Sequence, residues 1–483
     1  MRRPTSTRIR HLFLPLAALA LLAGCSGPSR EASAPPLDPG QVNLIFVVSP
    51  DLAYQAPGDI RMDTANLTSQ GLQRSLLMAT YLREQVLGGR NVTTISALEP
   101  MTHLQTANGY PDLGAMEFIQ QFALLNQFSM PGMGPGTAVV AANSYPLNGS
   151  YGAGPLPVGV AAPAVPSLGC QGLDFNDTNG NNEALMEGII SAKVPGFFIF
   201  SAPWEVVSTM LARLDGIGSH SLGLPTSYQG PNQIFAIAIS PQGSPSFASY
   251  DASLAPPATF PVLPAPILPA LSPMQAPFSL SRTGGVPAGS NTNETLYLIR
   301  HVEAHPTSAW EDGNYVAAGQ WRALALPAAL SGKIMPDLVY SIDPAQALPL
   351  SQFEPGENNI SYVRPALTLE PYAIANDLPF RLVSSLDLMV PDSPQQTSDF
   401  FFTGGSFSNH VILVAWEHDH IPPIVNALLA GYQSSGPNAP AWPDNDYDSI
   451  WRIVLDGQGN VTVDNALAEG IDSASLPATA PMF

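Results

Sequence analysis

The sequence predicts an α/β protein made of two duplicated three-layer α/β/α domains, each with a mainly parallel sheet. Three observations support this prediction. Apolar segments typical of strands alternate with segments of helical period, the second half repeats the pattern of the first, and a stretch rich in proline and alanine separates the two. The 483 residues, 45% of them hydrophobic, are enough for two cores of ordinary size.

Residues 1–24 are typical of an export signal. Arginines precede an apolar run at residues 12–22 that is too short to span a bilayer comfortably. The run ends in Leu-Ala-Gly-Cys, which resembles the lipobox of bacterial lipoproteins and implies acylation of Cys25. Because serine rather than aspartate follows, the resemblance implies the outer membrane, facing the periplasm. Residues 25–41 would then form a flexible tether between the lipid and the first domain.

The chain is strongly acidic, with 18 Lys+Arg, 38 Asp+Glu and a formal net charge of -20. Such a surface repels nucleic acid, so we expect no nucleic-acid partner. A phosphorylated ligand would need a local basic pocket that works against the overall field. With Cys25 acylated, Cys170 would have no partner for an intramolecular disulfide.

The first domain, residues 42–245, is expected to begin with a strand at residues 42–49. The helix that follows, residues 67–82, has a clear 3.6-residue apolar period, and Thr68 or Ser69 would cap it. The next expected elements are a strand at 92–97, helices at 114–126 and 184–191, a strand at 196–201 and a helix at 204–214. Residues 174–180 hint at a calcium loop, but the spacing of their side chains favours a turn-rich loop.

The second domain, residues 293–465, repeats this pattern. Four pairs of segments correspond in the same order: 296–301 with 44–49, 319–326 with 71–78, 411–418 with 197–202, and 450–459 with 234–243. Four ordered matches indicate an internal duplication. The proline- and alanine-rich residues 246–292 predict an extended linker, and residues 466–483 are expected to form a C-terminal tail.

Candidate functional residues gather in the second half, at the ends of predicted strands. The strand at residues 296–301 ends in Arg300 and His301, so both side chains should lie at the carboxyl edge of a sheet. Arg364 opens a later helical segment, and His418 and Asp419 follow a late strand. Function is therefore expected at this edge.

These residues resemble the motifs of the histidine phosphatase superfamily, also called phosphoglycerate mutase-like. The family motif Leu-Ile-Arg-His-Gly-Glu corresponds to Leu-Ile-Arg-His-Val-Glu at residues 298–303, the Arg before a Thr to Arg364 and Thr368, and the late His to His418. The resemblance covers residues 294–460 with these motifs and, through the repeat, residues 42–245 without them. It implies phosphoglycerate mutase-like domains and a phosphomonoester hydrolase that acts on a small phosphorylated substrate and needs no metal or organic cofactor.

The resemblance also implies roles for these side chains. His301 would be the nucleophile that becomes phosphohistidine, His418 would donate hydrogen bonds to the phosphoryl oxygens, and Arg300 and Arg364 would bind the phosphate. Two residues are candidates for the general acid. Asp419 corresponds to the acid of the acid phosphatase branch, and Asp387 would supply it as in the mutase branch. We prefer Asp419 because its neighbour His418 belongs to the site.

Departures from the family pattern keep a second interpretation open. Val302 replaces the family glycine. In the first domain, Val48 and Ser49 stand in place of Arg-His, and Thr102 in place of the second-motif arginine, so that copy keeps the fold without the chemistry. If the second copy were degenerate too, the protein would be an anion-binding or scaffold lipoprotein.

A metal site is a further alternative. His301, Glu303 and His305 alternate along the chain, and His418 and His420 could add two ligands. Two arginines beside a cation argue against this arrangement. The metal-free interpretation therefore comes first, with Glu303 and Glu417 orienting their neighbours.

Overall fold

The structure is a computed structural model that describes most of the chain. The described residues are 34–54, 58–105, 109–126, 128–130, 140–142, 172–177, 180–216, 222–304, 312–344, 347–348, 360–383 and 394–483. Ala34–Phe483 form one compact unit. The predicted signal peptide, Cys25, Cys170, His305 and Asp387 lie outside the described residues. Within the described residues, no helix has both the length and the apolar character needed to cross a membrane.

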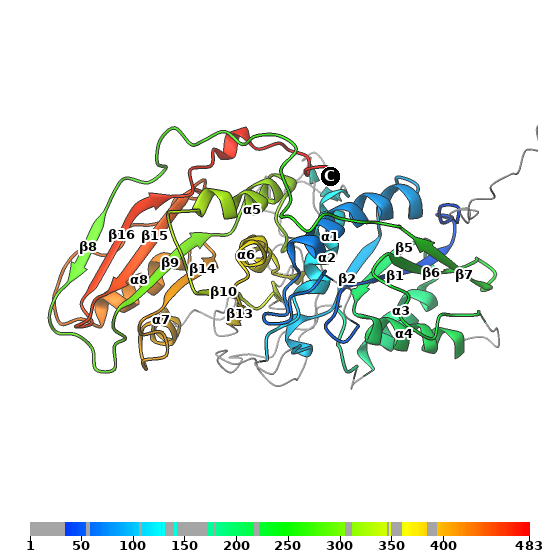
Figure 1. Cartoon of the computed structure of the whole chain (residues 1–483), viewed down its shortest axis with the longest axis horizontal. Coiled ribbons are helices and arrows are strands. Elements are labelled where there is room, and N and C mark those ends of the chain that lie inside the picture. The colour runs from blue at the N-terminus through cyan, green and yellow to red at the C-terminus, as the bar shows by residue number, and fades with distance from the viewer. Residues whose placement is uncertain are drawn as a thin grey trace, which may run out of the picture. The chain divides into compact units, whose positions relative to one another are not determined.

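The first half contains a five-stranded sheet of order β2-β5-β1-β6-β7 (Figure 1). The central strand β1 runs parallel to β5 and antiparallel to β6, which in turn pairs antiparallel with β7. The strands of this sheet are β1 (Val42–Val48), β2 (Thr94–Ala97), β5 (Gly196–Ala202), β6 (Gln233–Ile239) and β7 (Pro245–Asp251). A separate two-stranded sheet is formed by β3 (Phe128–Met130) and β4 (Val140–Ala142).

Helices cover both faces of this sheet, because the side chains of β1 alternate between two apolar layers. Ile45 and Val47 pack with one pair of helices, and Leu44 and Phe46 pack with the other. The first pair is α1 (Ser69–Tyr81) and α2 (Gly114–Leu124), and the second is α3 (Asn181–Ala192) and α4 (Trp204–Gly216). Short helical turns are η1 (Leu82–Val86) and η2 (Pro100–Thr102). The predicted cap is confirmed: the Thr68 hydroxyl accepts a hydrogen bond of 3.1 Å from the Gly71 backbone N–H.

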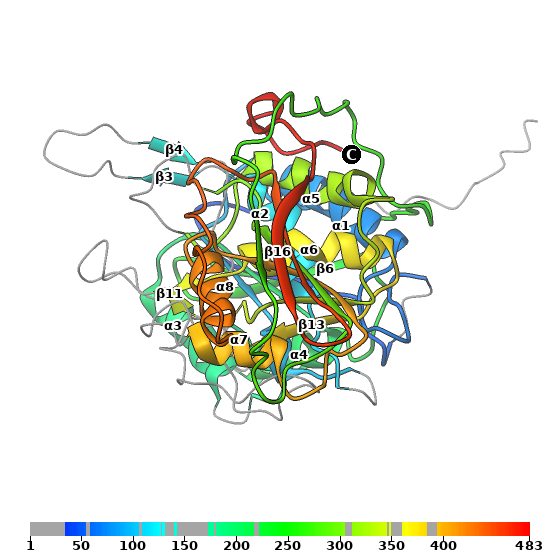
Figure 2. The same cartoon turned by 90° about the vertical axis from the view of Figure 1, so that its left-hand side faces the viewer.

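The second half contains a seven-stranded sheet of order β13-β10-β14-β9-β15-β16-β8 (Figure 1), and Figure 2 views it with β16 in front. Its strands are β8 (Ser279–Arg282), β9 (Glu294–Arg300), β10 (Leu338–Ile342), β13 (Phe380–Val383), β14 (Val411–Trp416), β15 (Ser449–Leu455) and β16 (Val461–Ala468). The helices are α5 (Ala317–Leu330), α6 (Arg364–Ala375), α7 (Pro394–Phe402) and α8 (Ile421–Ala430). Smaller elements are β11 (Ala347–Leu348), β12 (Ile360–Ser361) and η4 (Ser473–Ser475).

The two sheets share one topology. Without its edge strands β13 and β8, the second sheet has the order β10-β14-β9-β15-β16, which matches β2-β5-β1-β6-β7 strand by strand and direction by direction. The register also agrees, since Val48 lies opposite Ala202 where Arg300 lies opposite Trp416. This agreement supports the duplication. Both sheets are mixed rather than mainly parallel, because each closing hairpin runs antiparallel to the central strand.

The predicted linker and tail belong to the folded body. The segment 246–292 supplies most of β7 to the first sheet and all of β8 to the second. Near the end of the chain, Trp321 in α5 donates a hydrogen bond of 2.8 Å to the Thr479 carbonyl, and Gln121 in α2 donates one of 2.7 Å to the Pro481 carbonyl. The last residues therefore contact both halves.

The two halves also meet directly through a shared interface. Helices α1 and α2 contact α6, and Asn66 donates a hydrogen bond of 2.8 Å to the Leu378 carbonyl. Gln120 and Asn314 exchange buried side-chain hydrogen bonds of 2.7 and 3.0 Å. One hydrophobic cluster includes Met116 from the first half and Val363 from the second. The halves thus share a core, which makes the second half dependent on the first for burial.

Four acidic residues are buried at this interface. Glu99 is close to Asp343, and Glu117 on α2 is close to Glu370 on α6. Burial, followed by the charge of Asp343, raises the pKa of Glu99 well above its usual range. Burial also raises the pKa of Glu117 to about 8, and burial with the charge of Glu117 raises the pKa of Glu370. Burial therefore favours the protonated form of Glu99, Glu117 and Glu370.

Candidate active site

Strand β9 places Arg300 and His301 at the carboxyl edge of the second sheet, as the sequence predicts. The strand pairs with β14 on one side and β15 on the other, and the His301 backbone N–H extends this ladder to the Trp416 carbonyl at 3.0 Å. Only 6% of Arg300 and 1% of His301 is exposed. The sheet therefore fixes the backbone that carries both side chains.

The imidazole of His301 is held in one neutral form. Its Nδ1 lies 2.8 Å from the Val302 carbonyl oxygen, which only accepts hydrogen bonds, so Nδ1 carries the proton and Nε2 carries the lone pair. Burial lowers the pKa of His301 well below its usual range, and the positive charges of Arg364 and Arg300 lower it further. A neutral imidazole beside two guanidinium groups is the result.

Aromatic rings support both arginines. The guanidinium carbon of Arg300 lies 4.0 Å from the centre of the Tyr447 ring, and that of Arg364 lies 4.9 Å from the centre of the Tyr362 ring. Arg300 also donates a hydrogen bond to the Asp444 carbonyl. Positive charge is thus concentrated around His301 in a chain that is acidic overall, as binding of a phosphoryl group requires.

Thr368 connects the first two motifs. Its hydroxyl donates to the Arg364 carbonyl at 2.7 Å and accepts from the Val302 backbone N–H at 3.1 Å. The first residue of α6 is therefore tied to the backbone that follows His301. The arginine–threonine spacing in the sequence indicated these residues but not this contact.

Glu417 orients the late histidine. Its carboxylate accepts hydrogen bonds from Nδ1 of His418, from Nδ1 of His420 at 3.1 Å and from the Asp419 backbone N–H at 2.7 Å. Burial raises the pKa of Glu417, but the hydrogen bonds from His418 and His420 outweigh it and hold the pKa well below the usual range. Because Glu417 stays ionised and occupies Nδ1, His418 is left with Nε2 to face a ligand.

Two carboxylates lie within reach of His418. Its Nε2 is 3.5 Å from Asp419 and 3.4 Å from Asp444, and both acidic side chains are exposed. Asp444 is a residue that the sequence did not single out, as is Tyr447. Both lie in the loop before β15, and the only sequence signal was a polar, acidic run just ahead of the closing strand.

Val302 fits the fold without glycine's freedom. Its backbone φ is not positive, so it does not need the conformation that favours glycine. Its side chain is buried in the hydrophobic cluster that also holds Tyr315 and Val363. A Cβ on Gly319 would lie 2.8 Å from a Val302 methyl carbon, so glycine at position 319 leaves room for this side chain. The valine is accommodated by α5 and requires no unusual backbone.

The alternative metal site is not assembled among the described residues. Glu303 receives hydrogen bonds of 2.8 Å from both Arg322 and Ser473. Arg322 is fully buried and also contacts Glu469 at 2.6 Å. Glu303 therefore serves a buried ion network, not a histidine cluster, and His305 lies outside the described residues. The adjacent Glu417, His418 and Asp419 could together hold an ion.

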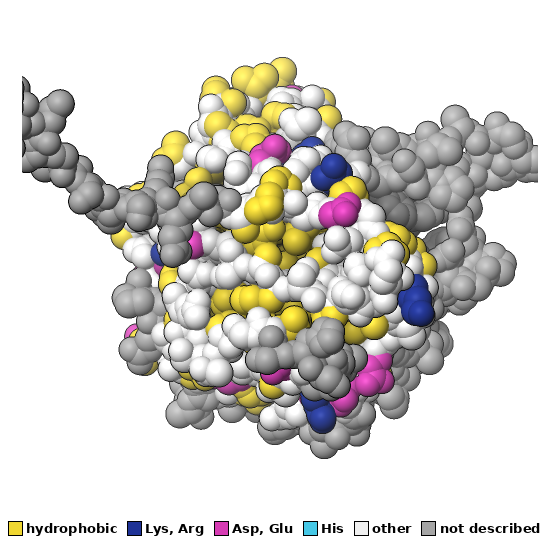
Figure 3. Space-filling view, turned by 90° about the vertical axis from the view of Figure 1, so that its right-hand side faces the viewer, with side chains coloured by type: hydrophobic (Ala, Val, Ile, Leu, Met, Phe, Trp, Pro, Cys, Tyr) yellow, Lys and Arg dark blue, Asp and Glu magenta, His cyan; other side chains and the backbone are white. Residues whose placement is uncertain are grey.

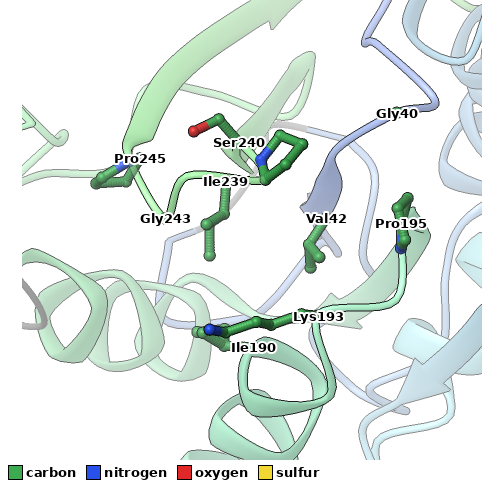
Figure 4. Close-up of a pocket in the computed structure, with 10 residues that line it drawn as sticks. Gly40, Val42, Ile190, Lys193, Pro195, Ile239, Ser240, Gly243 and Pro245 are labelled. Carbon is green, nitrogen blue, oxygen red and sulfur yellow. The ribbon is translucent and has the colours of Figure 1, made fainter.

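Another cavity lies away from these residues, at the amino end of β1 (Figure 4). It has a volume of about 200 Å³, and Val42, Ile190 and Ile239 form much of its apolar lining. Among the described residues that line it, Lys193 is the charged one.

Comparisons with known proteins add the following. No protein-family model matches the chain, and no curated protein is significantly similar to it. Among solved structures, one similar chain is a protein assigned as the phosphohistidine phosphatase SixA from Agrobacterium tumefaciens, with 14% identity and a TM-score of 0.22, covering 34% of this chain and 91% of that chain. A protein with the same assignment from Nakamurella multipartitia has 18% identity and a TM-score of 0.21, covering 40% and 94%. YhfR from Bacillus stearothermophilus has 15% identity and a TM-score of 0.22, covering 37% and 98%.

Proposed function

We propose that the second half is a phosphomonoester hydrolase that works through a phosphohistidine at His301. One observation carries this proposal: a buried, neutral imidazole with a free Nε2 stands beside two arginines at the carboxyl edge of a sheet. Arginine forks suit a phosphoryl group, and a neutral imidazole is a nucleophile. The substrate class is a small phosphomonoester.

The proposed reaction has two steps. In the first, Nε2 of His301 forms a bond to phosphorus as the bond to the leaving oxygen breaks, and Asp419 gives that oxygen a proton. In the second, Asp419 takes a proton from a water molecule that attacks phosphorus, and the phosphorus–nitrogen bond breaks to restore His301. Arg300, Arg364 and His418 stabilise the negative charge on the phosphoryl oxygens throughout.

Trapping of the intermediate tests this proposal. The full-length protein in detergent should release p-nitrophenol from p-nitrophenyl phosphate, with or without a chelator. Rapid mixing with a ³²P-labelled phosphomonoester and quenching in base should leave label on the protein, and acid should release it. An inactive protein that still binds inorganic phosphate, without label across a panel of phosphomonoesters, would instead favour the anion-binding alternative.

We also propose that the protein is a lipoprotein of the cell envelope, anchored through Cys25. The lipobox-like sequence and the apolar segment with arginines before it support this. Cells fed labelled palmitate should yield labelled protein in the membrane fraction, and Cys25→Ser should abolish the label. Wild-type protein without label, found in the soluble fraction, would contradict the anchor.

A further inference from the structure

The first half carries the opposite charge at the edge that corresponds to the candidate active site. By the shared register, Ser49 follows β1 as His301 follows β9, and Glu205 lies in the first turn of α4, just after β5. Asp51, two residues after Ser49, is buried at this edge. Neutral residues therefore take the places of the arginines and the histidine of the second half, but acids lie beside them, so the copy without phosphatase motifs is not simply an empty one.

Three side chains from separate segments converge there. Nδ1 of His103 lies 3.0 Å from an oxygen of Asp112 and 3.5 Å from an oxygen of Asp51. One ligand atom from each of these residues lies within 4.8 Å of the other two. Two carboxylates and one imidazole at this separation can contact one ion simultaneously.

The loops hold these ligand atoms in place. Asp51 uses its Oδ1 to accept the Ala53 backbone N–H at 2.6 Å, and Asp112 uses its Oδ1 to accept the Gly114 backbone N–H at 3.0 Å. The Oδ2 of each carboxylate is the one that faces His103. The His103 ring stacks on Phe175, with ring centres 3.6 Å apart and planes inclined by 4°. Hydrogen bonds and stacking of this kind orient metal ligands before the ion binds.

One oxygen of Asp51 is a buried acceptor without a hydrogen-bond donor. Asp51 is only 3% exposed, yet its Oδ2, which faces His103, has no hydrogen-bond partner among the described residues. The charges that act most on Asp51 are Asp112, Glu205 and His103, with no lysine or arginine among them. A bound cation would contact this oxygen and offset the negative charge of the two buried carboxylates.

We propose that the first half binds a divalent transition-metal ion through Asp51, His103 and Asp112. The mixed oxygen and nitrogen donors suit zinc or manganese better than calcium or magnesium, which prefer oxygen alone. Glu205 lies at the edge of this site, where it could bind a water molecule on the ion. In the alternative, no metal binds and His103 is protonated. The three residues would then form ion pairs with one another.

Metal binding by the full-length protein tests this proposal. After removal of metal with a chelator, the protein is equilibrated with zinc or manganese chloride, and bound metal and the thermal midpoint are measured. We expect one equivalent of metal, a higher midpoint, and loss of both in the Asp51→Asn/Asp112→Asn variant. The loss of affinity should exceed the roughly 10- to 100-fold that follows loss of an outer-shell partner.

Two controls keep the result interpretable. Metal-free Asp51→Asn/Asp112→Asn protein should be folded and at least as stable as the metal-free wild type, because its amides remove the repulsion. Asp419→Asn alters the other candidate cluster and should still bind the ion. The proposal fails if the wild type binds no metal, if the double variant retains it, or if Asp419→Asn alone abolishes it. Hydrolysis is measured separately, so the two proposals can fail independently.

Discussion

Replacement of His301 with alanine is expected to reduce phosphomonoester hydrolysis by about 10⁴-fold or more, which is the scale seen when a covalent nucleophile is removed. The reason is geometric. Nε2 of His301 is the buried nitrogen that two arginines surround, and no described histidine replaces it there. The measurement is kcat with p-nitrophenyl phosphate, together with the amount of trapped phosphoenzyme.

His410 provides a matched control for this variant. It precedes β14 at the other end of that strand from His418, is exposed, and bonds to Asp337 at 2.7 Å. His410→Ala should retain full activity and full labelling. Activity of His301→Ala close to that of the wild type would reject the phosphohistidine mechanism, provided that its circular dichroism and thermal midpoint show a folded protein.

The second prediction concerns pH: the free energy of unfolding should fall as pH rises from about 5 to about 8. In the folded state Glu99, Glu117 and Glu370 have raised pKa values, and that of Glu117 is about 8. Their contribution is complete below the unfolded value of 4.5 and is lost as pH rises through the folded value. Each such group therefore lowers the free energy of unfolding as pH rises within that window. Glu294 and Glu469, with pKa values raised to about 8, act in the same direction.

Glutamine at position 117 offers a direct check. Glu117→Gln needs no proton, so its urea midpoint should exceed that of the wild type at pH 8 and approach it at pH 5. Glu84→Gln, at an exposed position, should follow the wild type throughout. Glu417 does not oppose this trend, because its lowered pKa costs stability only as pH falls below its usual range. His301, with its lowered pKa, opposes the trend up to its unfolded value of 6.5, as one group against five. A wild-type stability that stays level or rises from pH 5 to pH 8 would disprove the explanation.

Local pattern was enough to predict the elements that position the candidate site. The strand that ends in Arg300, the helix capped by Thr68 and the register shared by the two halves all follow from periodicity and order along the chain. Residues joined to a motif by short spacing, such as His418 and Asp419, were found for the same reason. The sparse charge seen on one face of the first half (Figure 3) also agrees with a charged fraction of 12%.

Contacts between distant segments could not be predicted in this way. Asp444 and Tyr447 reach Arg300 only because β15 pairs with β9, and a loop before a strand has no periodic signal. Each pair of buried acids has one residue from the first half and one from the second, such as Glu117 and Glu370. The sequence pattern of either half alone could not predict that they meet. In the first half, Asp51 meets His103 and Asp112, which lie some fifty and sixty positions later in the chain. No sequence motif connected these residues.

The contact between Val302 and Gly319 bears on how such proteins are found. A search pattern that demands glycine directly after Arg-His rejects this chain, although its strand end keeps the arginine and histidine in place. The room for the Val302 side chain is supplied by α5, since Gly319 has no Cβ to meet the valine. In this chain, a side chain at position 302 therefore depends on the lack of one at position 319.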